Sequence, residues 1–184
     1  MYLPSNKRTE ATAIKDWFER HRNDGYSLYA VTITYKPRRS GLDHTPEQIN
    51  KIFHKTYFEK FLGKHLLRNN HWQSKLKAIQ PYAMCFVEEH EAKAVATKTG
   101  YIFPSRLHHH VILAVHPATK SQMDKFLGED TLLGLHPGIA TTKVERADAN
   151  WTLYSTKAYR AYEEHFKAYG PPGELVASRA LPLC

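Results

Sequence analysis

The sequence predicts an α+β fold, in which helices flank one antiparallel sheet of about five strands. Apolar residues make up 42% of the 184-residue chain, which is enough for a full core. Helix-like and strand-like patterns follow one another in the order helix, strand, helix, strand, strand, helix, strand, helix. We see no internal repeat and no linker that would divide the chain. This order is typical of a single sheet covered by helices.

The first half of the chain is predicted to form a helix, a strand and a second helix. Residues 9–22 carry apolar side chains at helical spacing, and the Asn-Asp-Gly sequence at 23–25 ends that helix. Residues 26–35 are rich in β-branched and aromatic side chains, which predicts a buried strand. The next helix follows Thr45, an N-cap with a proline and a capping-box glutamine behind it, and reaches about residue 66.

The second half is predicted to complete the sheet. Strands are expected at residues 82–90, 107–115 and 139–144. A short helix is expected at 119–127 and a longer one from 151 to about 168.

Residues 1–170 are expected to form one domain and residues 171–184 a tail that contains proline and glycine. No apolar run approaches the roughly 20 residues of a membrane helix, so no membrane is expected as a partner. The start of the chain is polar and basic, unlike a signal peptide, and two cysteines make no disulfide framework. We therefore expect a cytoplasmic protein.

The formal net charge of +8 favours a polyanionic partner, most simply nucleic acid. Basic residues are concentrated on one side of the second predicted helix and in the loop before it. The residues expected to contact DNA are Lys55, Lys60, Lys64, Arg38 and Arg39. The alternative is a solvated basic helix face without a partner.

Three consecutive histidines give the most informative pattern. Alternation along a strand places His108 and His110 on one face, about 7 Å apart, and His109 on the other. Two such imidazoles can bind one metal ion. Glutamates that could complete the site lie near the expected edge of the same sheet: Glu88, Glu89 and Glu91. Two histidines and a carboxylate suit Mn²⁺ or Mg²⁺ at a phosphate, as well as zinc at a water molecule.

Tyr154 and Lys157 are three residues apart in the last predicted helix and so share a face. A nearby metal ion or lysine lowers the cost of forming a phenolate and stabilises charge on an attacked phosphate. The alternative is a tyrosine that packs its ring on the sheet.

Taken in order, these segments resemble the HUH endonucleases, the superfamily of rolling-circle replication initiators, relaxases and single-strand transposases. Residues 30–35 are similar to the first motif, a central strand that ends in threonine and an aromatic residue. The histidine strand is similar to the His–hydrophobic–His motif, although His109 stands where an apolar residue is usual. Tyr154 and Lys157 match the Tyr-x-x-Lys motif of the replication initiators.

The resemblance implies a metal-dependent, sequence-specific nickase and strand transferase of single-stranded DNA. His108, His110 and Glu89 would bind Mn²⁺ or Mg²⁺. Glu89 is preferred because a glutamate ends a short apolar strand in the family pattern, and Glu88 is the runner-up. Tyr154 would attack the scissile phosphate, release a 3′-hydroxyl and remain as a 5′-phosphotyrosine.

The implied partner is single-stranded DNA at an origin or a hairpin, with the replication machinery of a bacterial host cell. The implied role is to initiate rolling-circle replication of a plasmid or a single-stranded DNA phage. Because the tyrosine follows the histidines, an initiator or a REP-type single-strand transposase fits better than a conjugative relaxase. Two rival classes are a non-catalytic nucleic-acid-binding module and a zinc hydrolase that uses a bound water.

Overall fold

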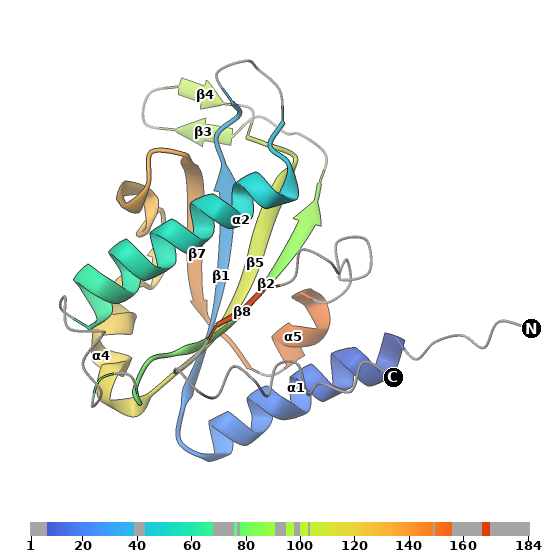
Figure 1. Cartoon of the computed structure of the whole chain (residues 1–184), viewed down its shortest axis with the longest axis vertical. Helices are drawn as coiled ribbons and strands as arrows, with labels where there is room; N and C mark the ends of the chain where they lie inside the picture. The colour runs from blue at the N-terminus through green and yellow to red at the C-terminus, as the bar shows by residue number, and fades with distance from the viewer. Residues whose placement is uncertain are drawn as a thin grey trace, which may run out of the picture.

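The structure, a computed structural model, has a six-stranded antiparallel sheet at its centre (Figure 1), which confirms the α+β fold class. It describes residues 7–38, 43–67, 76, 78–90, 95–97, 100–102, 104–148, 150–155 and 167–169. The strands run in the order β6-β7-β1-β5-β2-β8. Their bounds are Gly128–Glu129 for β6, Ile139–Arg146 for β7, Ser27–Tyr35 for β1, Leu107–Val115 for β5, Tyr82–Glu89 for β2 and Lys167–Tyr169 for β8. A separate hairpin joins β3 (Val95–Thr97) to β4 (Gly100–Ile102).

Helices cover both faces of the main sheet (Figure 1). α1 (Lys7–Asn23) and α5 (Asn150–Ser155) pack on one face, and α2 (Pro46–Lys55) with η1 (Thr56–Leu66) on the other. Short helical turns connect β5 to β7: η2 (Pro117–Thr119), α4 (Lys120–Met123), η3 (Asp124–Phe126) and η4 (Leu133–Leu135). Within the described ranges, no helix is both long and apolar enough to cross a membrane.

Strand β5 is buried along its whole length because both of its faces are covered. Val111 and Leu113 pack in the core beneath α2 and η1, whereas Ile112 and Ala114 pack against α1. Because of this alternation, neighbouring side chains at the start of β5 point to opposite faces of the sheet, one toward α2 and the other toward α1. His109 lies on the α2 side, and its two neighbouring histidines lie on the α1 side, as the alternation predicts.

The predicted helix after Thr45 is present, and its second half has π-helical geometry. The backbone N–H of Thr45 donates to Oε1 of Gln48 at 3.0 Å, as the capping box predicts. In η1 and its C-cap residue, pairs of buried side chains recur about every five residues rather than every three or four, at Thr56 and Tyr57, Phe61 and Leu62, and Leu66 and Leu67. This longer period keeps the apolar side of the helix against the sheet to its end.

The predicted helix from 151 to about 168 is wrong at its C-terminal end. Lys167–Tyr169 forms strand β8, whose Tyr169 pairs with Ala83 of β2. The ring of Tyr169 is buried against Phe53 and Tyr57. Burial of this aromatic side chain at the sheet edge competes with helix formation and accounts for the difference. The predicted tail at 171–184 lies outside the described residues.

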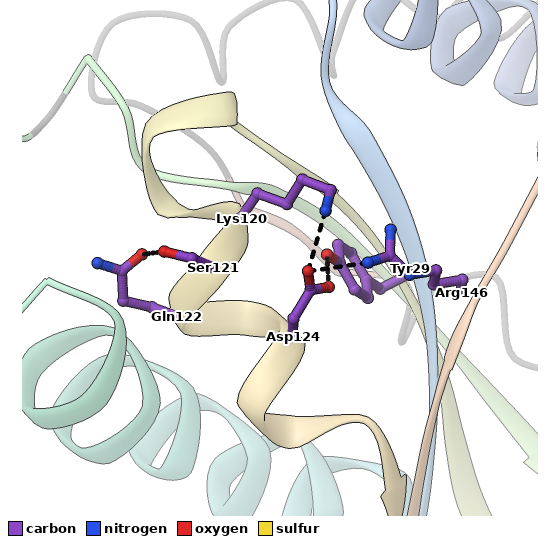
Figure 2. Close-up of polar contacts among 6 residues, drawn as sticks. All are labelled: Tyr29, Lys120, Ser121, Gln122, Asp124 and Arg146. Atoms are coloured by element: carbon purple, nitrogen blue, oxygen red, sulfur yellow. Dashed lines mark hydrogen bonds and ion pairs between the residues drawn. The ribbon is translucent and has the colours of Figure 1, made fainter.

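Asp124 links the segment between β5 and β7 to the sheet by hydrogen bonds (Figure 2). Its carboxylate accepts hydrogen bonds from the hydroxyl of Tyr29, the ammonium of Lys120 and the guanidinium of Arg146. The hydrogen bonds from Tyr29 and Lys120, with the positive charges beside them, hold the pKa of Asp124 below its usual value. Tyr29 pairs with Leu113, so this cluster lies toward the end of β5 that is far from the histidines.

Candidate metal centre

Three side-chain donor atoms converge on the α1 side of the sheet: Oε2 of Glu88, Nε2 of His108 and Nε2 of His110. The glutamate oxygen lies 2.8 Å from the His110 nitrogen and 3.5 Å from the His108 nitrogen. The two nitrogens are 3.1 Å apart. Both imidazoles are buried, and the Glu88 side chain is 12% exposed. The structure thus contains a group of one glutamate and two histidines placed to hold a metal ion.

The register between β2 and β5 brings Glu88 next to the two histidines. Glu88 pairs with His108 across β2 and β5, while Thr34 and Thr32 of β1 pair with His108 and His110. Directly paired residues of antiparallel strands point to the same face of the sheet. The two histidines, two residues apart on β5, therefore share that face with Glu88.

The separations between the donor atoms fit ligands of a single ion. Nitrogen and oxygen ligands lie about 2.0–2.2 Å from zinc, and oxygen ligands about 2.0–2.1 Å from magnesium. Neighbouring ligands at such distances are about 3.0 Å apart in an octahedral site and about 3.4 Å apart in a tetrahedral one. The observed separations of 2.8, 3.1 and 3.5 Å cover this range. One carboxylate and two imidazoles also leave coordination positions open for a substrate.

The preferred third ligand, Glu89, is not part of this group. Its side chain is 41% exposed and forms an ion pair with Arg106, at 2.6 Å. Glu89 pairs with Leu107, so it points to the opposite face from Glu88. Register thus corrects the choice between the two glutamates in favour of the runner-up.

His109 is fixed on the α2 side by two buried partners. Its Nδ1 lies 2.6 Å from the hydroxyl of Tyr35, and its Nε2 lies 2.9 Å from Oδ1 of Asn50 on α2. With the amide oxygen of Asn50 accepting from Nε2–H, the phenol of Tyr35 donates to Nδ1 of a neutral imidazole. Burial, together with the charges of His108 and His110, lowers the pKa of His109 to about 3. These hydrogen bonds satisfy a buried imidazole at the position where the motif that the sequence resembles usually has an apolar residue.

Tyr154 lies beside the donor group on α5. Its ring centroid is 5.5 Å from that of His110 and 5.5 Å from that of Trp151, and Trp151 in turn lies 5.3 Å from His110. Tyr154 is 51% exposed, so solvent reaches this side chain next to the buried imidazoles. Lys157, the expected partner of Tyr154, lies outside the described residues.

The lysines expected to bind DNA lie on the other side of the sheet. Lys55 ends α2, and Lys60 and Lys64 belong to η1, which packs opposite the face that carries the metal-ligating group. Arg38 follows β1 at the end of the sheet where Thr34 pairs with His108. Arg39, the other arginine of that loop, lies outside the described residues.

The structure adds polar and aromatic residues that sequence reasoning did not assign to the site. Oγ1 of Thr32 lies 3.2 Å from Nδ1 of His110, and the ring of His90 lies 4.6 Å from that of His108. Exposed Lys143 pairs with Thr32 and so shares the face of the donor group. Strand alternation gives the faces of β1, but only the register of three strands reveals these neighbours.

Comparison of the sequence with models of known protein families finds no match, and comparison with curated proteins finds none either. Geometry and chemistry of the donor group therefore carry the functional interpretation.

Proposed function

We propose that this protein nicks and rejoins single-stranded DNA by the chemistry of the HUH endonucleases, with Tyr154 as the nucleophile beside a divalent metal centre. The observation that carries the proposal is the meeting of two features on one face of the sheet. Glu88, His108 and His110 present three converging donor atoms, and the exposed Tyr154 lies against His110. A metal ion beside a nucleophile favours phosphoryl transfer to a side chain, because its charge stabilises the attacked phosphate.

Glu88, His108 and His110 would hold Mn²⁺ or Mg²⁺, which supplies positive charge that polarises the scissile phosphate. The phenol oxygen of Tyr154 forms a bond to phosphorus while the bond from phosphorus to the 3′-oxygen breaks. The phenol proton leaves to solvent, and the 3′-oxygen takes up a proton to become a hydroxyl. The phosphate stays on Tyr154 as a 5′-phosphotyrosine. Attack by a second 3′-hydroxyl reverses these steps and rejoins the strand.

Other residues on the α1 side can position the substrate strand. Lys143 is in register with Thr32, and Thr32 with His110, so Lys143 lies two strands, or about 10 Å, from the metal ligand. Its ammonium forms an exposed ion pair with Glu145, at 2.9 Å, and can exchange this partner for a phosphate near the cleaved one. Trp151 beside Tyr154 offers an aromatic ring to a base. The charge of the chain favours a nucleic-acid partner. The position of the nucleophile after the histidines fits an initiator of rolling-circle replication or a single-strand transposase better than a relaxase.

Incubation of the protein with labelled single-stranded DNA of random sequence and Mn²⁺ tests the proposal. We expect a nicked product and a protein–DNA adduct that survives denaturation. Tyr154→Phe should keep the fold and abolish the adduct, because it removes only the hydroxyl. Tyr26→Phe is the matched control, because Tyr26 is half-buried and directly precedes β1, at the end of that strand far from the histidines. This variant should form the adduct normally.

The same assay separates the rival functions. Metal-dependent cleavage without an adduct indicates a hydrolase that activates water, and binding without cleavage indicates a non-catalytic module. A further assay with a DNA hairpin as substrate tests the single-strand transposase, which would transfer one strand onto another at the hairpin. Cleavage without an adduct, or binding without cleavage, contradicts the role of Tyr154 as nucleophile.

A further inference from the structure

Thr32 is the residue of β1 that stands directly opposite His110 in the sheet. Its hydroxyl oxygen lies 3.2 Å from Nδ1 of the His110 ring, while Nε2 of the same ring points toward Glu88 and His108. The two ring nitrogens of His110 therefore have separate tasks. One faces the metal-ligating group, and the other faces a hydroxyl fixed on the neighbouring strand.

This arrangement can accommodate the ring tautomer that a metal ion needs, because a threonine hydroxyl can accept as well as donate a hydrogen bond. Nε2 can bind a cation only through its lone pair, so the ring proton must then be on Nδ1. In that tautomer Nδ1–H donates to Oγ1 of Thr32. Thr32 is β-branched, which restricts the rotation that would carry its hydroxyl away.

We propose that Thr32 is a positioning residue of the metal centre, which orients the ring of His110 and accepts the hydrogen bond of its Nδ1–H when Nε2 binds a metal ion. This inference rests on the metal centre of the proposed function and adds to it a residue that does not touch the metal ion. Partners of this kind on ligating histidines typically contribute about 10- to 100-fold to metal affinity.

Thr34 provides a matched control on the same strand and the same face. It stands opposite His108, but its hydroxyl is hydrogen-bonded to that of Thr141, at 2.6 Å. Thr32 and Thr34 are both partly buried. Replacement of either threonine by valine removes one hydroxyl and keeps the branched shape, so both variants should unfold at similar temperatures without metal.

The experiment measures the affinity of the full chain for Mn²⁺ and Zn²⁺ by titration calorimetry. Thr32→Val should bind about 10- to 100-fold more weakly than the wild type. Thr32→Ser keeps a hydroxyl and should restore most of the affinity, and Thr34→Val should bind like the wild type.

Equal affinities in the wild type and Thr32→Val would overturn the role of Thr32 alone, provided that His108→Ala loses binding. Equal losses in Thr32→Val and Thr34→Val would overturn it as well, because the effect would then be general to this strand. No binding by the wild type would overturn both the metal centre and the role of Thr32.

Discussion

Glu88 and Glu89 are neighbours on β2, and the sheet gives them opposite environments. Glu88 lies with the two histidines, whereas the exposed carboxylate of Glu89 pairs with Arg106. The sequence offers Glu88, Glu89 and Glu91 as third ligands, and only one of Glu88 and Glu89 can serve, because adjacent side chains of a strand face opposite ways. The choice depends on the register between β2 and β5, which no local pattern specifies.

Exchange of each glutamate for glutamine tests this assignment. Glu88→Gln removes a charged ligand, so metal affinity should fall by more than the roughly 100-fold that a partner outside the ligand set contributes. Glu89→Gln breaks an exposed ion pair and should leave metal affinity unchanged, at a cost of about 1 kcal/mol or less in stability. Calorimetric titration of both variants makes the comparison. A loss of binding in Glu89→Gln alone would contradict the site described above.

The lowered pKa of His109 predicts that the stability of the folded protein depends on pH. Its pKa is about 3 in the folded protein and about 6.5 in the unfolded chain, so the unfolded chain binds the proton more readily. Above pH 6.5 the imidazole of His109 is neutral in both states, and its full contribution to the free energy of unfolding is present. This contribution is lost as the pH falls from 6.5 toward 3. Over this window the free energy of unfolding should decrease by up to about 1.4 kcal/mol per pH unit from this residue.

Urea unfolding between pH 4 and pH 6.5 measures this slope. His109→Gln places a neutral amide near Tyr35 and Asn50 and should flatten the slope. His65→Gln changes an exposed histidine of η1 and should leave the slope as in the wild type. An unchanged slope in His109→Gln would show that His109 is not the residue that titrates.

At the scale of elements, the lysine-rich helices α2 and η1 lie on one face of the sheet and the candidate metal centre on the other. The net charge of the chain does not distinguish these two surfaces. The helix pair carries the densest run of lysines, yet it packs on the face opposite to the metal-ligating group. Amphipathic spacing predicts which side of a helix meets the sheet, but it does not predict which face of the sheet the helix covers. A strand of DNA at Tyr154 would have to pass around the sheet edge to reach these lysines.

Replacement of Lys55, Lys60 and Lys64 by glutamine tests whether this second surface binds DNA. If it does, binding should weaken, and its dependence on salt should flatten by up to about one slope unit for each lost phosphate contact. Fluorescence anisotropy of labelled single-stranded DNA at several salt concentrations gives the slope.

A control with the same loss of charge is needed, since any reduction in net charge weakens binding to a polyanion. Lys15, Arg20 and Lys125, which belong to α1 and η3, can be replaced by glutamine together. If both triple variants lower the slope equally, the lysines of α2 and η1 form no specific surface and their prediction is wrong.

Across the whole molecule, the sequence predicts the elements better than their assembly. The helix after Thr45 and the strand of three histidines follow from local capping and alternation, and both are confirmed. The strand at Lys167–Tyr169 could not be predicted, because Tyr169 is stabilised by aromatic residues more than 100 positions away. The same holds for the candidate metal centre, whose donor residues come from two strands and whose neighbouring threonine comes from a third.

Peptide mapping of the trapped protein–DNA adduct tests the central claim most directly. After digestion with a protease and a nuclease, mass spectrometry identifies the residue that carries the nucleotide. We predict a 5′-linked nucleotide on Tyr154, formed only with a divalent cation and absent from His110→Ala. A nucleotide on another tyrosine, or an adduct of undiminished yield in Tyr154→Phe, would contradict this account.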